Sequence, residues 1–336
     1  MIAVVCLNPA LDVTHHVPAV DWAGVNRPAA VHARPGGKGL NVARTLHALG
    51  VDVLVLGLAG GITGTGVEAA LGELGIPAAF TPVAGETRRT FTVVDGRGAA
   101  AMFSEPGPPV SAPEFEGFRA RYQSALAGSA AVALSGSLPP GLPAGTYATL
   151  IELATAAGVP AVLDAHGEAL LRGAAAGPAI VKPNLAELEA LAGRRLSTER
   201  GADRDAVAAA AGQLRKAGAQ AVVASLGAEG LLAATGDGRW RARPPAVVAG
   251  NATGAGDAVA AALVHGLVLG RPWDERLRHA VALGAATAAA PAAGEFRHAD
   301  YASALPQVTV RRVAVRRVAV RRVAVRQVTA HRDEAR

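Results

Sequence analysis

The sequence has little of several features that define whole classes of protein. Among its 336 residues there is one cysteine, Cys6, which excludes a disulfide scaffold and a zinc site built from several cysteines. No apolar run is long enough to cross a bilayer, since the run at 258–270 is short and the alanine-rich stretch after His279 is interrupted by Pro291. The first residues lack the basic segment of a signal peptide and are expected to form a buried strand. A soluble cytoplasmic protein is therefore expected.

Aromatic residues make up only 4% of the chain, and no RNA-binding aromatic motif is present, although the net charge is +6. Residues 309–336 hold nine arginines against Asp333 and Glu334, so the rest of the chain carries 24 basic and 25 acidic side chains. The basic charge thus belongs to a tail in which valine, alanine and arginine repeat every five residues. Five matches neither the strand period nor the helix period, so the tail is expected to be disordered. It is either a polyanion-binding arm or a repeat expansion without selected function.

Lysine is scarce as well: only Lys38, Lys182 and Lys216 occur among 33 basic residues. Two of them lie in unusual contexts, Gly-Gly-Lys38-Gly and Val-Lys182-Pro-Asn. Because the lysine ammonium is a compact point charge that suits phosphate, these two positions are candidates for binding a phosphorylated ligand.

Short apolar runs alternate with amphipathic patterns along the chain. This alternation predicts a mostly parallel sheet covered by helices on both faces, with the loops that bind ligands gathered at one edge. The expected strands are 2–7, 51–58, 130–135, 161–164, 179–182 and 221–225. The expected helices are 40–49, 64–74, 144–157, 184–191, 204–217, 255–269 and 274–290.

Two segments, 12–34 and 87–103, are β-rich and contain no helix between their strands. We expect them to form a small antiparallel flap whose apolar face is covered by the substrate cleft or by a second subunit; the alternative is a pair of ordinary surface hairpins. Alternation along the strand sends His15 and His16 to opposite faces, which argues against a metal site there.

The local motif that carries most information is Asn251-Ala-Thr-Gly-Ala-Gly-Asp257, followed by an apolar helix. Gly254 and Gly256 allow successive N–H groups to point into one concavity at the start of a helix, which is an anion site. A carboxylate beside such a site is electrostatically unfavourable unless it accepts a proton, so Asp257 is a candidate general base for phosphoryl transfer.

A second glycine-rich motif, Pro35-Gly-Gly-Lys-Gly-Leu-Asn41, leads into a helix. It matches neither a Walker A loop nor the dinucleotide fingerprint Gly-x-Gly-x-x-Gly. Alone it predicts only a glycine-rich helix entry, in which Lys38 and Asn41 offer a cation and an amide.

Six motifs follow one another in order: Asn8-Pro-Ala-Leu-Asp12, Gly36-Gly-Lys-Gly-Leu-Asn41, Ser135-Gly-Ser-Leu-Pro-Pro-Gly141, Val181-Lys-Pro-Asn-Leu-Ala-Glu187, Ser225-Leu-Gly-Ala-Glu-Gly230 and Gly254-Ala-Gly-Asp257. The set resembles the PfkB (ribokinase-like) carbohydrate kinases, and most of all their 1-phosphofructokinase and tagatose-6-phosphate kinase branch. The resemblance covers residues 1–305 and leaves 306–336 outside. It implies a three-layer α/β/α kinase domain with a mostly parallel central sheet and a small antiparallel β lid from 12–34 and 87–103. Such a lid often forms a homodimer interface.

The resemblance also implies roles for individual residues. Asp257 matches the catalytic base, and the amides of Gly254, Ala255 and Gly256 match the anion hole. The residues that would hold the sugar hydroxyls are Asp12, Gly36, Gly37, Asn41 and Ser137. The cations that would receive the phosphate already on the substrate are Lys38, Arg88 and Arg27, with Arg88 favoured over Arg89 by the family pattern. The nucleotide-side residues are Lys182, Asn184, Ser225, Gly227 and Gly230, and Glu187 would organise Mg²⁺ through water.

Two positions depart from the family pattern. Ala252 replaces a hydroxyl residue before the Gly-Ala-Gly-Asp motif, which puts a phosphate or monovalent-cation contact in doubt. Asp164-Ala-His-Gly167 replaces a more common Asp-[Ser/Thr]-Ser-Gly, so a polar contact near the cleft differs.

The implied reaction is ATP-dependent phosphorylation of a ketohexose phosphate, foremost fructose 1-phosphate to fructose 1,6-bisphosphate. Tagatose-6-phosphate kinase and 6-phosphofructokinase activities are alternatives that the motifs do not separate. A different class, a sugar-phosphate sensor whose basic tail binds nucleic acid, has the intact Gly-Ala-Gly-Asp motif against it.

Overall fold

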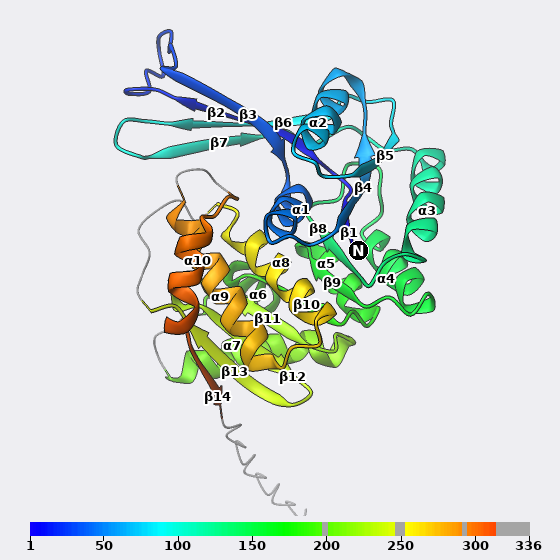
Figure 1. Cartoon of the computed structure of the whole chain (residues 1–336), viewed down its shortest axis with the longest axis vertical. Helices are drawn as coiled ribbons and strands as arrows, with labels where there is room; N and C mark the ends of the chain where they lie inside the picture. The colour runs from blue at the N-terminus through cyan, green and yellow to red at the C-terminus, as the bar shows by residue number, and fades with distance from the viewer. Residues whose placement is uncertain (197–200, 246–252, 291–293, 314–336) are drawn as a thin grey trace, which may run out of the picture.

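The computed structural model describes residues 1–196, 201–245, 253–290 and 294–313. A ten-stranded sheet forms its centre (Figure 1). In spatial order its strands are β14 (Thr309–Val313), β13 (Gly238–Arg243), β12 (Leu231–Thr235), β11 (Val222–Ser225), β10 (Ile180–Val181), β9 (Ala161–Asp164), β8 (Ala131–Ser135), β1 (Ile2–Cys6), β4 (Val53–Ala59) and β5 (Ala78–Pro82). From β5 to β11 all neighbours run parallel, and β12, β13 and β14 are added antiparallel.

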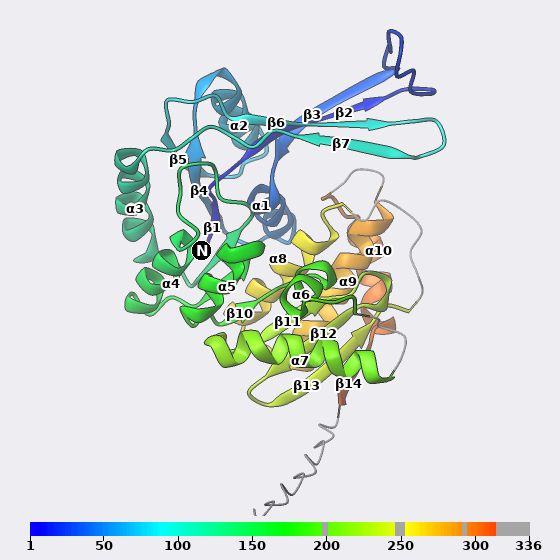
Figure 2. The ribbon, with the colours of Figure 1, turned by 180° about the vertical axis from the view of Figure 1, so that it is seen from behind.

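Helices cover both faces of this sheet, which gives the three layers expected from the sequence. One face packs against α1 (Lys38–Ala48), α2 (Gly61–Glu73), α8 (Ala255–Val268), α9 (Trp273–Ala289) and α10 (His298–Ala304). The other face, seen in Figure 2, packs against α3 (Ala112–Leu126), α4 (Thr146–Ala156), α5 (Gly167–Ala175), α6 (Leu185–Ala192) and α7 (Gly201–Ala217). Because the central strands are buried on both sides, their side chains are apolar at almost every position, as in β1. Cys6 is one of these buried residues.

A second sheet of four strands, in the order β3-β2-β6-β7, projects from the main body as the lid (Figure 1). It consists of β2 (Ala10–His16), β3 (Ala30–Gly36), β6 (Arg88–Val94) and β7 (Ala100–Ser104). The two hairpins are antiparallel, as predicted, and a parallel pairing of β2 with β6 joins them. His15 stacks on Phe91 and His16 contacts His32, in accord with the prediction that the two histidine rings point to opposite faces.

Every strand and helix predicted from the apolar pattern is present, with small shifts at its ends. Both glycine-rich motifs lead into helices, α1 and α8, whose first turns lie side by side at the edge of the sheet where the parallel strands end. Among the described residues, no helix combines the length and apolarity needed to cross a membrane.

Ordered structure continues past residue 305, which corrects the expectation for the tail. After a short 3₁₀ turn, η2 (Leu305–Gln307), the first copy of the repeat forms β14 against β13. Val310 packs against the core, and the Arg312 guanidinium lies 5.8 Å from the centre of the Trp240 ring. Within one copy of a five-residue repeat, successive side chains can point to alternate faces of a strand. Because five is an odd number, the conflict with the strand period arises only when a second copy follows, in which each residue type would point to the opposite face. The remainder of the predicted tail, 314–336, lies outside the described residues, as does Ala252.

Candidate active site

The start of α8, predicted from the sequence as an anion site, lies at the wall of a cavity. Gly254 adopts a left-handed conformation (φ 85°) that turns the chain into the helix, and among the described residues no side-chain cap is formed at this end. The first N–H groups of a helix have no carbonyl partner within it, and they carry the positive end of the helix dipole. Gly254, Gly256 and Asp257 line the adjoining cavity. The amides of Gly254, Ala255 and Gly256 are therefore placed to receive negative charge.

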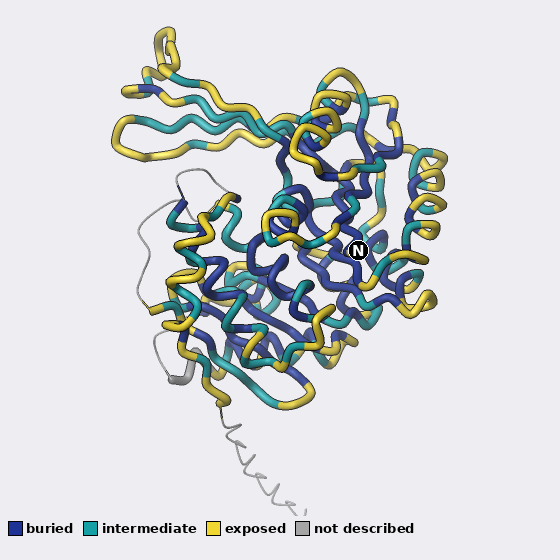
Figure 3. Tube along the Cα trace, viewed as in Figure 1, coloured by how far each residue is buried: buried dark blue, intermediate teal, exposed yellow. Residues whose placement is uncertain are grey.

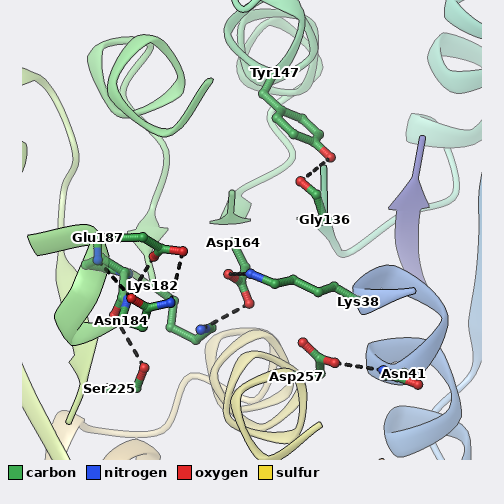
Figure 4. Close-up of polar contacts among 11 residues, drawn as sticks. Lys38, Asn41, Gly136, Tyr147, Asp164, Lys182, Asn184, Glu187, Ser225 and Asp257 are labelled. Atoms are coloured by element: carbon green, nitrogen blue, oxygen red, sulfur yellow. Dashed lines mark hydrogen bonds and ion pairs between the residues drawn. The ribbon is translucent and has the colours of Figure 1, made fainter. Parts of the chain in front are cut away.

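Asp257 stands in the first turn of α8 and is buried. Its Oδ2 accepts a hydrogen bond of 2.8 Å from Asn41 Nδ2 (Figure 4). Burial, and then the negative charge of Asp164, raise the pKa of Asp257 to about 7, against the opposing effects of Asn41, Lys38 and Lys182. The carboxyl group can thus exchange a proton at neutral pH.

The β3–α1 turn brings a second group of predicted residues to the same place. Gly37 has a φ of 93°, and a Cβ built on Gly36 would lie 2.0 Å from the Asp12 carboxylate, so only glycine leaves room for that side chain. Burial raises the pKa of Asp12, partly offset by a hydrogen bond from Thr90. Asn41 follows Lys38 by one turn of α1, so both side chains reach the cavity.

Asp164, at the end of β9, pairs with two lysines. Its Oδ1 lies 3.1 Å from Lys38 Nζ and its Oδ2 lies 3.0 Å from Lys182 Nζ. The residue was noted in the sequence only as part of a variant motif. Its two partners are far from it in the chain, so local spacing carries no signal for this pairing.

Asn184 and Glu187 form a reciprocal cap at the start of α6. Asn184 Oδ1 accepts from the Glu187 amide (2.9 Å), and Glu187 Oε2 accepts from the Asn184 amide (2.8 Å). Glu187 Oε1 lies 3.1 Å from Asn184 Nδ2. Ser225, from the adjoining β11, approaches the same loop through the Pro183 carbonyl.

Two neighbouring cavities run across this edge of the sheet. The first, of about 660 Å³, is lined by most of the predicted residues: Asp12, Gly37, Lys38, Asn41, Arg88, Ser137, Lys182, Asn184, Ser225, Gly254, Gly256 and Asp257. The second, of about 680 Å³, has a mainly apolar lining that includes Gly227, Gly230, Val259 and Val281. Asn184, Ser225 and Gly256 line both, so the two cavities adjoin one another at the start of α8.

Not every predicted residue reaches these cavities. Arg27 is exposed in the loop between β2 and β3 and lines neither of them. Arg88 lines the first cavity, whereas Arg89 pairs with Glu105 at 3.3 Å. Glu187 lies behind Asn184 and lines neither cavity.

Several residues that line the first cavity carried no assigned role in the sequence. Asn8 donates to Ser137 Oγ (3.1 Å) and to the Pro106 carbonyl (3.0 Å), and so joins the loop after β8 to the segment that follows lid strand β7. Asn8 belongs to one of the six motifs, and this membership was the signal in the sequence that could have identified it as a cavity residue. His166 and Met102 also line this cavity.

The carboxylates near the nucleotide-side residues are occupied by partners of their own. Both Glu187 oxygens accept from Asn184, and both Asp164 oxygens face lysines. Within the described part of the chain, no group of three or more His, Cys, Asp or Glu side chains is placed to bind a metal. Mg²⁺ keeps several waters and is bound through one or two carboxylates and the phosphates of a substrate.

Comparison with known proteins gives a consistent result. The model of the pfkB family carbohydrate kinases matches residues 4–299. The 1-phosphofructokinase of Escherichia coli K12 is 35% identical over 284 residues, which cover 84% of this chain and 89% of that protein. Phosphofructokinase-2 of Escherichia coli, solved with potassium, superimposes with a TM-score of 0.84 at 31% identity, covering 91% and 98% of the two chains. A Thermotoga maritima protein described as a possible 1-phosphofructokinase gives a TM-score of 0.82 at 27% identity, covering 93% and 99%.

Proposed function

Because the chain belongs to the PfkB family of carbohydrate kinases, and is thereby a sugar-phosphate kinase that uses ATP, we propose that it converts fructose 1-phosphate to fructose 1,6-bisphosphate. ATP would supply the phosphoryl group, ADP would leave, and the proton of the sugar hydroxyl would be released. The identity to 1-phosphofructokinase over most of both chains supports this choice of sugar. The proposed reaction would draw on the ATP of the cytoplasm.

The observation that carries the proposal is the position of Asp257. Its carboxylate stands in the helix turn whose amides would form the anion hole, and Asn41 donates a hydrogen bond to it. In this proposal Asp257 takes the proton of the attacking hydroxyl. The Gly254, Ala255 and Gly256 amides receive the charge that develops on the transferred group.

Most of the remaining predicted residues divide between the two cavities. Asp12, Gly37, Asn41 and Ser137 would hold the sugar in the first, where Gly36 leaves room for the Asp12 carboxylate, with Arg88 near the phosphate that the sugar already carries. The adenosine of ATP would occupy the second, between Gly227, Gly230 and α8, and its phosphates would extend past Lys182, Asn184 and Ser225. Mg²⁺, held by Glu187 through water, would neutralise negative charge on these phosphates.

We also propose that the lid forms a homodimer. Its loop and outer strands expose Trp22 (77%), Val25 (78%), Val31 (53%) and Phe103 (53%). Exposed apolar residues gathered on one projecting sheet mark a protein interface. Arg27 lies on the same loop as Trp22, so this interface is where it would act.

A second candidate, 6-phosphofructokinase activity, is favoured by one finding. Phosphofructokinase-2 of Escherichia coli in complex with fructose-6-phosphate superimposes with a TM-score of 0.80. Tagatose-6-phosphate kinase activity stays open from the sequence motifs.

A coupled assay of ADP release would test the proposal. The purified protein is given ATP with fructose 1-phosphate, fructose 6-phosphate, tagatose 6-phosphate or unphosphorylated fructose. We expect kcat/KM for fructose 1-phosphate to exceed the others at least tenfold. A preference for fructose 6-phosphate would support the second candidate, and ADP release that no sugar stimulates would contradict both.

A further inference from the structure

Asp164 fixes two cations that come from opposite sides of the cleft. Lys38 reaches it from the start of α1, on the sugar side, and Lys182 reaches it from the loop after β10, on the nucleotide side (Figure 4). The side chains of Asp164 and Lys182 are 2% and 4% exposed, whereas that of Lys38 keeps 37%. A buried carboxylate between two lysines thus leaves an excess positive charge, and the more exposed of the two ammonium groups faces the cavity.

This pair of ammonium groups lies at the anion hole. A Cβ built on Gly256 would be 3.6 Å from Lys182 Nζ, which places that ammonium beside the first turn of α8. Lys38, the second lysine, is close enough to Asp164 and Asp257 for both negative charges to stabilise its ammonium form. The two lysines therefore flank the space between the proposed base and the anion-hole amides, through which the transferred group must pass.

Arg88 occupies a separate place in the same cavity. It extends from lid strand β6, where its Nε donates to the Asn8 carbonyl (3.2 Å) and its Nη1 to Ser104 Oγ (2.8 Å). The site thus has two cationic positions, one at the transfer point and one under the lid. A substrate that carries a phosphate before transfer needs a position for each phosphoryl group.

We propose that Asp164 is a positioning residue that joins Lys38 and Lys182 into one receptor for the phosphoryl group in transit. Lys38 then serves the transfer itself, and Arg88 serves the phosphate that the sugar already carries. This inference rests on the proposed function, and it moves Lys38 from the role that the sequence implied. The transferred group spreads negative charge over three oxygens, which two ammonium groups and the helix amides can contact together.

Replacement of each cation by an uncharged side chain separates the two roles. Steady-state kinetics at saturating ATP would be compared for Lys38→Met, Arg88→Met and the control Lys216→Met, the remaining lysine, which is exposed on α7. We expect Lys38→Met to lower kcat at least 100-fold and to change KM for the sugar phosphate less than threefold. Arg88→Met should raise that KM at least tenfold, and Lys216→Met should change neither value. If Lys38→Met raises KM as Arg88→Met does and keeps kcat, the inference is wrong.

The pH profile tests Asp164 in a way that a purely structural role does not predict. Asp257 is faced by Asn41, Lys38, Lys182 and Asp164. Since Asp164 raises the pKa of Asp257 and Lys38 lowers it, Asp164→Asn should shift the acidic limb of kcat/KM to lower pH, and Lys38→Met should shift it to higher pH. Asp164→Asn should also lower kcat at least 50-fold. If the acidic limbs of the two variants stay where the wild-type limb is, or if both move in the same direction, the positioning role of Asp164 is wrong.

The design keeps this inference apart from the proposed function. The variants are assayed with whichever ketohexose phosphate the wild-type protein accepts, and their melting temperatures are recorded. A preference for another sugar would overturn the proposed substrate, whereas the split between kcat and KM would still decide the role of Lys38. Because Lys38 is partly exposed, its variant keeps the test usable even where Asp164→Asn does not fold.

Discussion

At the scale of single residues, the environment of Asp257 would serve the proposed proton transfer at the expense of stability. Its burial beside Asp164 raises its pKa to about 7. A base is most effective when its pKa is close to the working pH, because it is then both available and able to hold the proton. The same burial means that the ionised form is poorly solvated in the folded protein.

Asp257→Asn should remove the base and leave the ligand contacts in place. We expect kcat to fall about 1,000-fold, within the range found for general bases, while KM for ATP and sugar change less than fivefold. Stopped-time assays of ADP release would measure this. The control is Asp205→Asn, a change of an exposed aspartate on α7. Turnover near the wild-type rate would refute the assignment of the base.

The raised pKa of Asp257 also makes a prediction about stability. Between pH 3.8 and about pH 7, Asp257 binds its proton more tightly in the folded protein than in the unfolded chain. The contribution of Asp257 to the free energy of unfolding therefore falls as the pH rises through this window. Asp257→Asn abolishes that loss. The variant should therefore melt roughly 2–6 °C higher than the wild type at pH 8. Calorimetry should find a smaller difference at pH 5, and an equal difference at both pH values would contradict this origin.

At the scale of elements, the sequence predicts what local order determines. The central strands are buried on both faces, so unbroken apolar runs identify them, and glycine-rich turns identify the starts of α1 and α8. Helix α3 was missed, although Ser111 and Glu114 form a capping box and Phe118, Tyr122 and Leu126 recur every four residues on its buried face. That signal was present in the sequence.

What the sequence could not supply is long-range pairing. The contact of Lys38 with Asp164 joins residues 126 positions apart, and that of Asn41 with Asp257 joins residues 216 positions apart. Neither contact has a local signature in the sequence. The roles expected of these residues therefore came from the family resemblance, and their relative positions are seen only in the folded structure. The parallel contact of β2 with β6 was missed for the same reason.

The β3–α1 turn allows a prediction at this scale. Gly36→Ala places a Cβ 2.0 Å from the Asp12 carboxylate, so that side chain must leave its position. We expect KM for the sugar phosphate to rise at least tenfold, and the free energy of unfolding to fall by about 1–3 kcal/mol through overpacking. The matched control is Gly72→Ala in α2, where a Cβ meets nothing within 4 Å. That change should leave kinetics intact and stabilise the helix by about 0.5–1 kcal/mol. Both variants would be measured in the ADP-release assay. Equal values of KM for the sugar phosphate in the two variants would refute the role of Gly36.

At the scale of the whole molecule, the lid is the element on which we propose a partner subunit. Val31 and Phe103 lie on the same exposed face of its sheet. The double variant Val31→Asp, Phe103→Asp should convert a dimer into a monomer of 33.7 kDa, as measured by light scattering after gel filtration. Leu269→Asp, at an exposed helix end away from the lid, should leave the mass unchanged. A wild type that is already monomeric would refute the proposed interface.

The division of charge between body and tail gives the last prediction. Seven of the nine arginines in 309–336 follow residue 313. A chain that ends at Val313 keeps β14 and both cavities, so its kcat and KM should equal those of the full chain. Any binding of duplex DNA by the full chain should be lost on truncation and should weaken with salt. A tail-dependent loss of turnover would instead assign the tail a part in the kinase reaction.

The burial of Cys6 at the end of β1 makes the chain well suited to spectroscopy. Burial raises the pKa of this thiol to about 11, so it stays protonated and shielded from maleimides at neutral pH. A cysteine introduced in place of Trp22 would then be the single reactive thiol, at the tip of the lid. A fluorophore attached there would report, without background, any change around the lid when sugar and nucleotide bind.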